Sequence, residues 1–123
     1  MMSNWARVAL LSLAASSASA QSQLAGEKLV NSQCIQCHTI GRGEPHGAGP
    51  NLYGTLGRPA ATAAGFKFSE RYVAAMKGRT WDAQLLDKWL ADTQALAPGN
   101  GMIYFQDDAR KRKQIIEYLA TLK

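Results

Sequence analysis

The side chains best suited to chemistry are two thiols and an imidazole that lie close together in the sequence. Cys34 and Cys37 are the two cysteines of the 123-residue chain, and His38 directly follows the second of them. Two thiols three positions apart can form thioethers to the two vinyl groups of one porphyrin, and the adjacent imidazole can then reach the iron. C-x-x-C-H is the spacing used to attach haem c. The motif therefore predicts one covalent haem c, bound by Cys34 and Cys37, with its iron ligated by His38.

Two other uses of a C-x-x-C pair compete with haem attachment. A secreted protein with two cysteines ordinarily forms a disulfide, but a loop this short gains little stability from closure entropy. A thioredoxin-type redox pair is expected beside a strand in a βαβ unit, and no segment of this sequence alternates like a strand. The histidine that directly follows the second cysteine favours haem attachment over both.

The second face of an iron held by His38 needs another ligand or stays open. Met102 follows Pro98–Gly101, a segment that cannot be helical and therefore presents Met102 from a loop. Tyr104 and Phe105 are expected to close an apolar wall beside it. We predict Met102 as the second metal ligand, and ligation by histidine and methionine raises the reduction potential of a haem.

Two other residues compete for that position. Met76 has Tyr72 and Val73 at helical spacing before it, so packing in the core is its expected role. His46 is the second histidine of the chain, and it lies in a Gly/Pro-rich segment. We expect His46 to be a loop residue rather than a ligand.

Residues 1–20 show the three parts of a secretory signal peptide. A positive charge at Arg7 precedes an apolar run over residues 8–15, and Ala18-Ser19-Ala20 forms an A-x-A cleavage pattern. The run is shorter than the roughly 20 residues needed to span a bilayer. We expect a cleaved signal peptide over 1–20, a single domain over 21–123 and a periplasmic location. An uncleaved anchor or a plain N-terminal helix is the alternative.

The charge balance is mildly basic, with 14 Lys and Arg against 9 Asp and Glu. Such a surplus can steer an acidic partner, whereas nucleic-acid binding calls for basic residues on one face together with a known motif. The densest basic run, Arg110 to Lys113, is typical of the solvated side of a helix. We therefore expect no nucleic-acid partner. Since no other apolar run approaches membrane-spanning length, we also expect no integral membrane span in residues 21–123.

Apolar residues at helical spacing, together with capping residues, predict helices at four places. These are residues 21–33, 69–77, 82–92 and 107–122. Seven glycines and three prolines between residues 41 and 65 predict a long loop. A loop of this length is usually functional, and wrapping a buried ligand is one way to keep it ordered. The predicted fold class is therefore all-α with long Gly/Pro-rich loops.

Gly26 lies inside the first predicted helix, where glycine costs roughly 1 kcal/mol relative to alanine. Its presence suggests that another helix crosses very close to this point. A chain of this size buries only about 60–65% of its unfolded surface. We therefore expect a cofactor to fill part of the core.

Taken together, residues 21–123 resemble a class I cytochrome c of the mitochondrial and bacterial c2 type. The matching segments are Cys34–Thr39, Gly49–Gly54, Gly57–Arg58, Gly65–Phe66, Thr80–Trp81 and Pro98–Ile103. The resemblance implies a single cytochrome c domain of about four to five short helices wrapped around one covalent haem. It also implies that Gly26 and Tyr118 lie where the first and last helices cross.

The same resemblance implies roles for residues around the haem. The carbonyl of Pro50 is expected to accept a hydrogen bond from the second ring nitrogen of His38, a contact that fixes the tautomer of a metal-bound histidine. Arg58 and Trp81 are expected near a haem propionate.

The chain departs from the family at positions where lysines are common. Gln33, Gly101, Asp107 and Asp108 stand at such positions. Docking of the family onto acidic oxidase or reductase surfaces relies on lysines around the exposed haem edge. That part of the resemblance is therefore weaker for this chain.

The expected function is one-electron transport in a periplasmic chain by a monomer, and not catalysis. In such proteins the redox chemistry belongs to the cofactor, and the protein buries and ligates it. Redox proteins are expected as donors and acceptors that dock transiently at the haem edge. Two alternatives stay open: a dedicated haem subunit that accepts electrons from a periplasmic dehydrogenase, and a haem enzyme or gas sensor with a displaceable sixth ligand.

Overall fold

The computed structural model describes the backbone of residues 4–123 and the side chains of residues 15–123. Within that range the chain forms five helices and no strand, which confirms the predicted all-α fold. The helices are α1 (Asn4–Gln33), α2 (Glu70–Met76), α3 (Ala83–Ala91), α4 (Thr93–Leu96) and α5 (Ala109–Ala120). Residues 1–3, at the start of the predicted signal peptide, lie outside the described residues.

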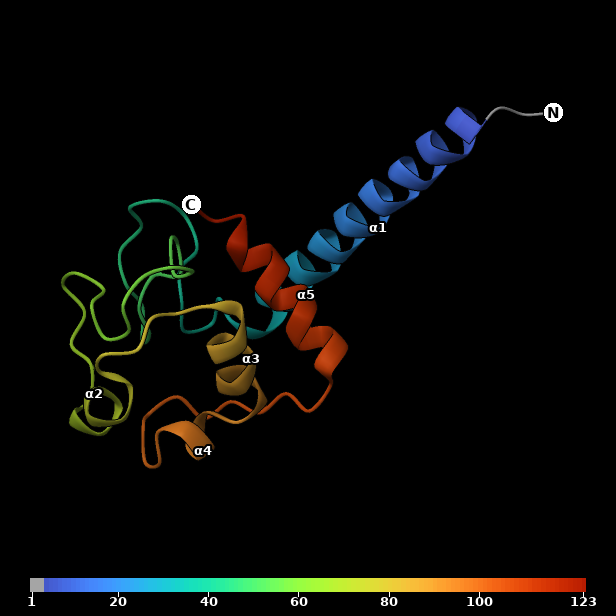
Figure 1. Cartoon of the computed structure of the whole chain (residues 1–123). Helices are drawn as coiled ribbons and strands as arrows, with labels where there is room; N and C mark the ends of the chain where they lie inside the picture. The colour runs from blue at the N-terminus through green and yellow to red at the C-terminus, as the bar shows by residue number, and fades with distance from the viewer. Residues whose placement is uncertain (1–3) are drawn as a thin grey trace.

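Helix α1 is longer than predicted, because it begins at Asn4 rather than at Gln21. The run between those residues contains no glycine or proline and is rich in alanine and leucine, which are among the best helix formers. Figure 1 shows this N-terminal part projecting away from the rest of the molecule, and the side chains of residues 15–20 are all exposed. None of the described helices is long and apolar enough to cross a membrane.

Helices α2, α3 and α5 begin next to side chains that cap them. Ser69, Asp82 and Asp108 each accept a hydrogen bond from a backbone N–H of the first turn, at 3.2, 2.7 and 2.9 Å. Such bonds satisfy N–H groups that have no partner within the helix. The predicted starts of these helices are accordingly close to the observed ones.

Helix α4 was not predicted. It is a single turn of four residues, too short to show a periodic apolar pattern. Asp92 caps it by accepting a hydrogen bond from the backbone N–H of Gln94 at 3.0 Å. The position of this turn matters because it supports the loop that follows it.

The first and last helices cross at Gly26, as Figure 1 shows for α1 and α5. A Cβ added at Gly26 would overlap the carbonyl oxygen of Gln114 and lie 2.9 Å from the Cβ of Tyr118. The predicted close crossing is therefore confirmed. Val30 of α1 and Ile115 of α5 are fully buried in the core.

The long loop between α1 and α2 is held by hydrogen bonds to other parts of the chain. The backbone N–H of Gly54 donates to the carbonyl of Leu122 at 2.6 Å, and that of Gly57 donates to the carbonyl of Trp81 at 2.7 Å. Asn51 is buried within the loop, and its Nδ2 donates to Thr39 Oγ1 at 2.8 Å. The loop is therefore an ordered wall of the fold, although it has little regular structure.

Gly26→Ala is expected to destabilise the protein by about 1–3 kcal/mol, the usual cost of overpacking a tight contact. The added methyl group collides with backbone atoms of α5, which cannot swing away as a side chain can. Urea denaturation of the purified protein measures the change in the free energy of unfolding.

Lys28→Ala is the matched control, since Lys28 is exposed on the same helix. It is expected to change that free energy by less than about 0.5 kcal/mol. A Gly26→Ala protein as stable as the wild type would show that α1 and α5 do not pack this closely.

Candidate cofactor site

The four predicted site residues, Cys34, Cys37, His38 and Met102, all line one cavity of about 570 Å³. This volume lies within the roughly 300–1,000 Å³ that is typical of ligand sites. Apolar and aromatic side chains make up much of the wall, among them Leu52, Phe66, Phe68, Leu86, Trp89 and Leu90. The cavity can therefore enclose a large flat apolar group between the turn that carries the thiols and the loop that carries Met102.

The two thiols are presented by a turn that continues from the end of α1. The backbone N–H of Cys34 donates to the carbonyl of Val30 at 2.9 Å, and that of His38 donates to the carbonyl of Cys34 at 2.9 Å. The two cysteines do not form a disulfide with each other. Burial raises the pKa of the Cys34 thiol to about 11, so that this group is neutral at physiological pH.

His38 is held in one orientation by the loop that follows it. Its Nδ1 lies 2.6 Å from the carbonyl oxygen of Pro50, and because a carbonyl only accepts, Nδ1 carries the proton. Burial lowers the pKa of His38, against the opposing effect of this hydrogen bond. The neutral ring therefore keeps the lone pair of Nε2 free, and neutral imidazole is the form that ligates metals.

Gly49 makes room for that ring. A Cβ at Gly49 would overlap the His38 ring, with Nδ1 at 2.7 Å and Nε2 at 2.8 Å. The residue before Pro50 therefore packs its bare backbone against the imidazole, and the pair Gly49-Pro50 fixes both the position and the tautomer of His38.

Met102 is half-buried, and α4 anchors its backbone. Its N–H donates to Oδ1 of Asn100 at 2.8 Å, and its carbonyl accepts a hydrogen bond from the hydroxyl of Thr93. Asn100 is itself buried, and its Nδ2 donates to the carbonyls of Thr93 at 3.2 Å and Ala97 at 2.7 Å. The structure therefore gives Thr93 and Asn100 a supporting role that the sequence pattern did not reveal, because buried and exposed polar residues look alike in a sequence.

The prediction of an apolar wall beside Met102 is confirmed for one of its two residues. Tyr104 lines the cavity, but Phe105 is 68% exposed and does not. The cavity lining contributed by this segment ends at Tyr104, and Phe105 pairs with Asp92 in an isolated antiparallel bridge. The prediction for Phe105 was wrong for that reason.

The two competing ligands lie elsewhere. Met76 is fully buried in the core and does not line the cavity, as expected. Both ring nitrogens of His46 are engaged: Nε2 lies 2.8 Å from the carbonyl oxygen of Ala64, and Nδ1 accepts from the N–H of Asn51 at 2.9 Å. His46 is thus a structural residue of the loop.

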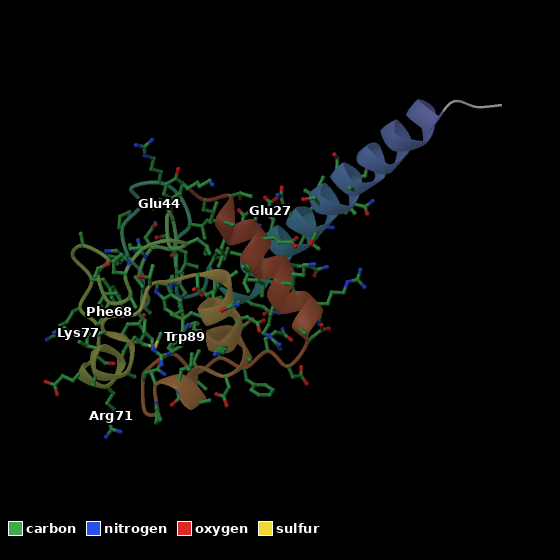
Figure 2. All side chains as sticks on the ribbon, viewed as in Figure 1. Glu27, Glu44, Phe68, Arg71, Lys77 and Trp89 are labelled. Atoms are coloured by element: carbon green, nitrogen blue, oxygen red, sulfur yellow. The ribbon has the colours of Figure 1, made fainter. Side chains whose placement is uncertain are left out.

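A row of aromatic rings forms part of the cavity wall. Ring centroids lie 5.1 Å apart for Phe68 and Tyr72, 5.5 Å for Tyr72 and Trp89, and 5.8 Å for Trp89 and Trp81. Figure 2 labels Phe68 and Trp89 on the side of the fold that carries α2 and α3. The rings join these two helices around the cavity.

Arg58 also lines the cavity and has only weak partners for its charge. Its guanidinium donates at 3.4 Å to the carbonyls of Tyr53 and Asn51 and to the hydroxyl of Thr55. Burial lowers the pKa of Arg58, although the group stays charged because arginine is so strongly basic. A guanidinium whose present hydrogen bonds are this long can donate to a carboxylate instead. Together with the two thiols, the neutral imidazole and the apolar walls, Arg58 fits a covalently attached haem.

The chain is similar to known proteins over most of its length and most of theirs. The chain is 44% identical over 94 residues to "Cytochrome c2 iso-2" of Magnetospirillum molischianum, an alignment that covers 73% of this chain and 91% of that protein. It is 40% identical over 101 residues to "Cytochrome c" of Cannabis sativa, covering 80% and 86% of the two chains. It is 38% identical over 99 residues to "Cytochrome c2" of Rhodopila globiformis, covering 80% and 91%. No family model matches the chain.

Gly49→Ala is expected to push the His38 ring away from Pro50 and to break the hydrogen bond at Nδ1. Exchange of the Nδ1 proton with solvent should then become at least about tenfold faster, the factor that corresponds to the loss of one hydrogen bond. Proton NMR of the protein with ¹⁵N-labelled histidine measures this rate.

Gly101→Ala is the matched control, because a Cβ at Gly101 has no heavy atom within 4 Å. It should leave the Nδ1 proton as protected as in the wild type. Equal protection in Gly49→Ala would contradict the role assigned to Gly49.

Proposed function

We propose a function from one premise: the chain belongs to the class I c-type cytochromes. The proteins of this family transfer electrons rather than catalyse reactions, and they carry one covalent haem c. This chain is accordingly an electron-transfer protein with one haem c and its iron. The more specific proposal is a periplasmic one-electron carrier whose iron is ligated by His38 and Met102.

Four residues would hold the haem. Cys34 and Cys37 would form the two thioethers, His38 would ligate the iron through Nε2, and Met102 would ligate it through its thioether sulfur. The observation that carries this proposal is that all four side chains line one cavity, although His38 and Met102 are 64 positions apart in the sequence. When bound, the haem supplies the one-electron chemistry of its iron.

The surrounding residues would keep both ligands in place during electron transfer. The Nδ1 hydrogen bond to Pro50 holds the His38 ring, and Thr93 and Asn100 hold the backbone of Met102. Ligands that persist in both oxidation states keep the rearrangement small. Arg58 and Trp81, which line the same cavity, are proposed to lie near a haem propionate.

We also propose that the protein is exported and monomeric, and that redox proteins dock transiently at its haem edge. The structure bears on export. The side chains of residues 15–20 are exposed, and the buried positions within residues 15–33 of α1 are Gly26 and Val30. Removal of residues 1–20 would therefore take no described side chain out of the core. This supports a signal peptide that ends at Ala20.

Met102→Ala is expected to abolish the methionine-to-iron charge-transfer band of the oxidised protein, since the sulfur that gives the band is gone. The reduced variant should also bind carbon monoxide rapidly, whereas the reduced wild type should bind almost none at neutral pH. Absorption spectroscopy measures both effects.

Met76→Leu is the control for loss of a methionine, because Met76 packs in the core outside the cavity. It should keep the band and cost less than about 1.5 kcal/mol of stability. Persistence of the band in Met102→Ala would refute the proposed ligand. Rapid carbon monoxide binding by the wild type would instead favour a gas sensor or haem enzyme.

The full chain, expressed in a bacterium that matures c-type cytochromes, is expected to yield a periplasmic protein that begins at Gln21. Mass spectrometry of the intact protein and of its N-terminal peptide checks this. Ala20→Phe places a large side chain at the small-residue cleavage position and should leave an uncleaved precursor. A wild-type protein that retains Met1 would contradict the proposed signal peptide.

A further inference from the structure

We propose that the hydrogen bond between Tyr104 and Gln33 is a latch that holds the Met102 loop against the turn that carries the cysteines. Tyr104 and Gln33 are then positioning residues for the sixth ligand of the haem. This inference rests on the proposed ligation of iron by Met102. It adds a pair of side chains whose function is to keep that ligand in place.

The latch joins two segments that are far apart in the sequence. The hydroxyl of Tyr104 donates to Oε1 of Gln33 at 2.6 Å, across 71 residues. Gln33 is the last residue of α1 and precedes Cys34, while Tyr104 follows Met102 by two residues. Both side chains line the cavity. The bond therefore spans the cavity wall between the two predicted ligand segments.

The other hydrogen bonds of the Met102 loop come from a different direction. Within the described part of the chain, residues 98–105 otherwise bond to one another, to the segment around α4 or, through the Tyr104 side chain, to Gln106. The amide of Gln94, for example, donates to the carbonyl of Asn100 at 3.1 Å. These bonds fix the shape of the loop on α4, but none of them ties it to the turn at Cys34.

The consequence concerns displacement of Met102. For an external ligand to reach the iron, the Met102 side chain must withdraw, and the loop or its side chains must move away from the cysteine turn. The hydrogen bond between Tyr104 and Gln33 joins the loop to this turn in the resting protein, so it has to break before the two can separate. Loss of the latch should therefore favour displacement without altering the ligation of the resting protein.

Imidazole binding to the oxidised haem-loaded protein tests the latch, because imidazole must displace Met102. Tyr104→Phe removes only the hydroxyl, and Gln33→Leu removes the acceptor. Each is expected to raise the association constant for imidazole about three- to tenfold, the range that one hydrogen bond supports. The double variant should show no larger increase than either single one, since both changes break the same bond.

Two further variants separate the latch from a general loosening of the fold. Gln33→Glu keeps an oxygen acceptor and should restore an association constant close to that of the wild type. Tyr118→Phe removes a hydroxyl from α5, away from the cavity, and should change nothing. All variants should show the full methionine-to-iron band before imidazole is added.

The outcomes distinguish the two proposals. A wild type without the methionine-to-iron band would refute the ligation by Met102 itself. A wild type with the band, combined with unchanged imidazole binding in Tyr104→Phe and Gln33→Leu, would overturn the latch alone. Additive effects of the two changes would also overturn it, because they would show that the residues act separately. Should Tyr104→Phe fold poorly, imidazole binding by Gln33→Leu still tests the latch, because Gln33 is exposed.

Discussion

The contact between α1 and α5 at Gly26 is the constraint on which the other features depend. The backbones meet there without a side chain between them, and this holds the C-terminal part of α1 against α5. The turn with Cys34, Cys37 and His38 follows directly from that end. The segment that follows α5 holds the long loop, because the N–H of Gly54 donates to the carbonyl of Leu122. One close crossing thus positions the thiols, the imidazole and the wall opposite them.

Around this crossing, the site combines apolar walls with a few fixed polar contacts. Burial makes a charged His38 unfavourable, and the carbonyl of Pro50 directs the remaining proton to Nδ1. Asn100 and Thr93 similarly satisfy buried backbone groups beside Met102. Polar groups in such surroundings are costly when unpaired, so these hydrogen bonds are conditions for the loops to close over the cavity. Stability and ligand geometry therefore depend on the same contacts.

One departure from the family pattern, at Gln33, affects the contacts of the Met102 loop. Gln33 stands where lysine is common, and it accepts a hydrogen bond from Tyr104. Ile103 is 80% exposed and Phe105 68% exposed in the same loop. Two large apolar side chains are thus exposed on the Met102 loop.

The sequence by itself determined the local features: the C-x-x-C-H motif, the Gly/Pro-rich loop, the capped starts of α2, α3 and α5, and the need for a close helix approach at Gly26. These follow from spacing, capping and propensity, which act over a few residues. Only the tertiary structure decided that Tyr104 faces the cavity while Phe105 faces solvent, that α4 supports the Met102 loop, and that Gln33 and Tyr104 meet. Such pairings depend on how distant segments pack, because the spacing of residues along the chain does not show which distant side chains come into contact.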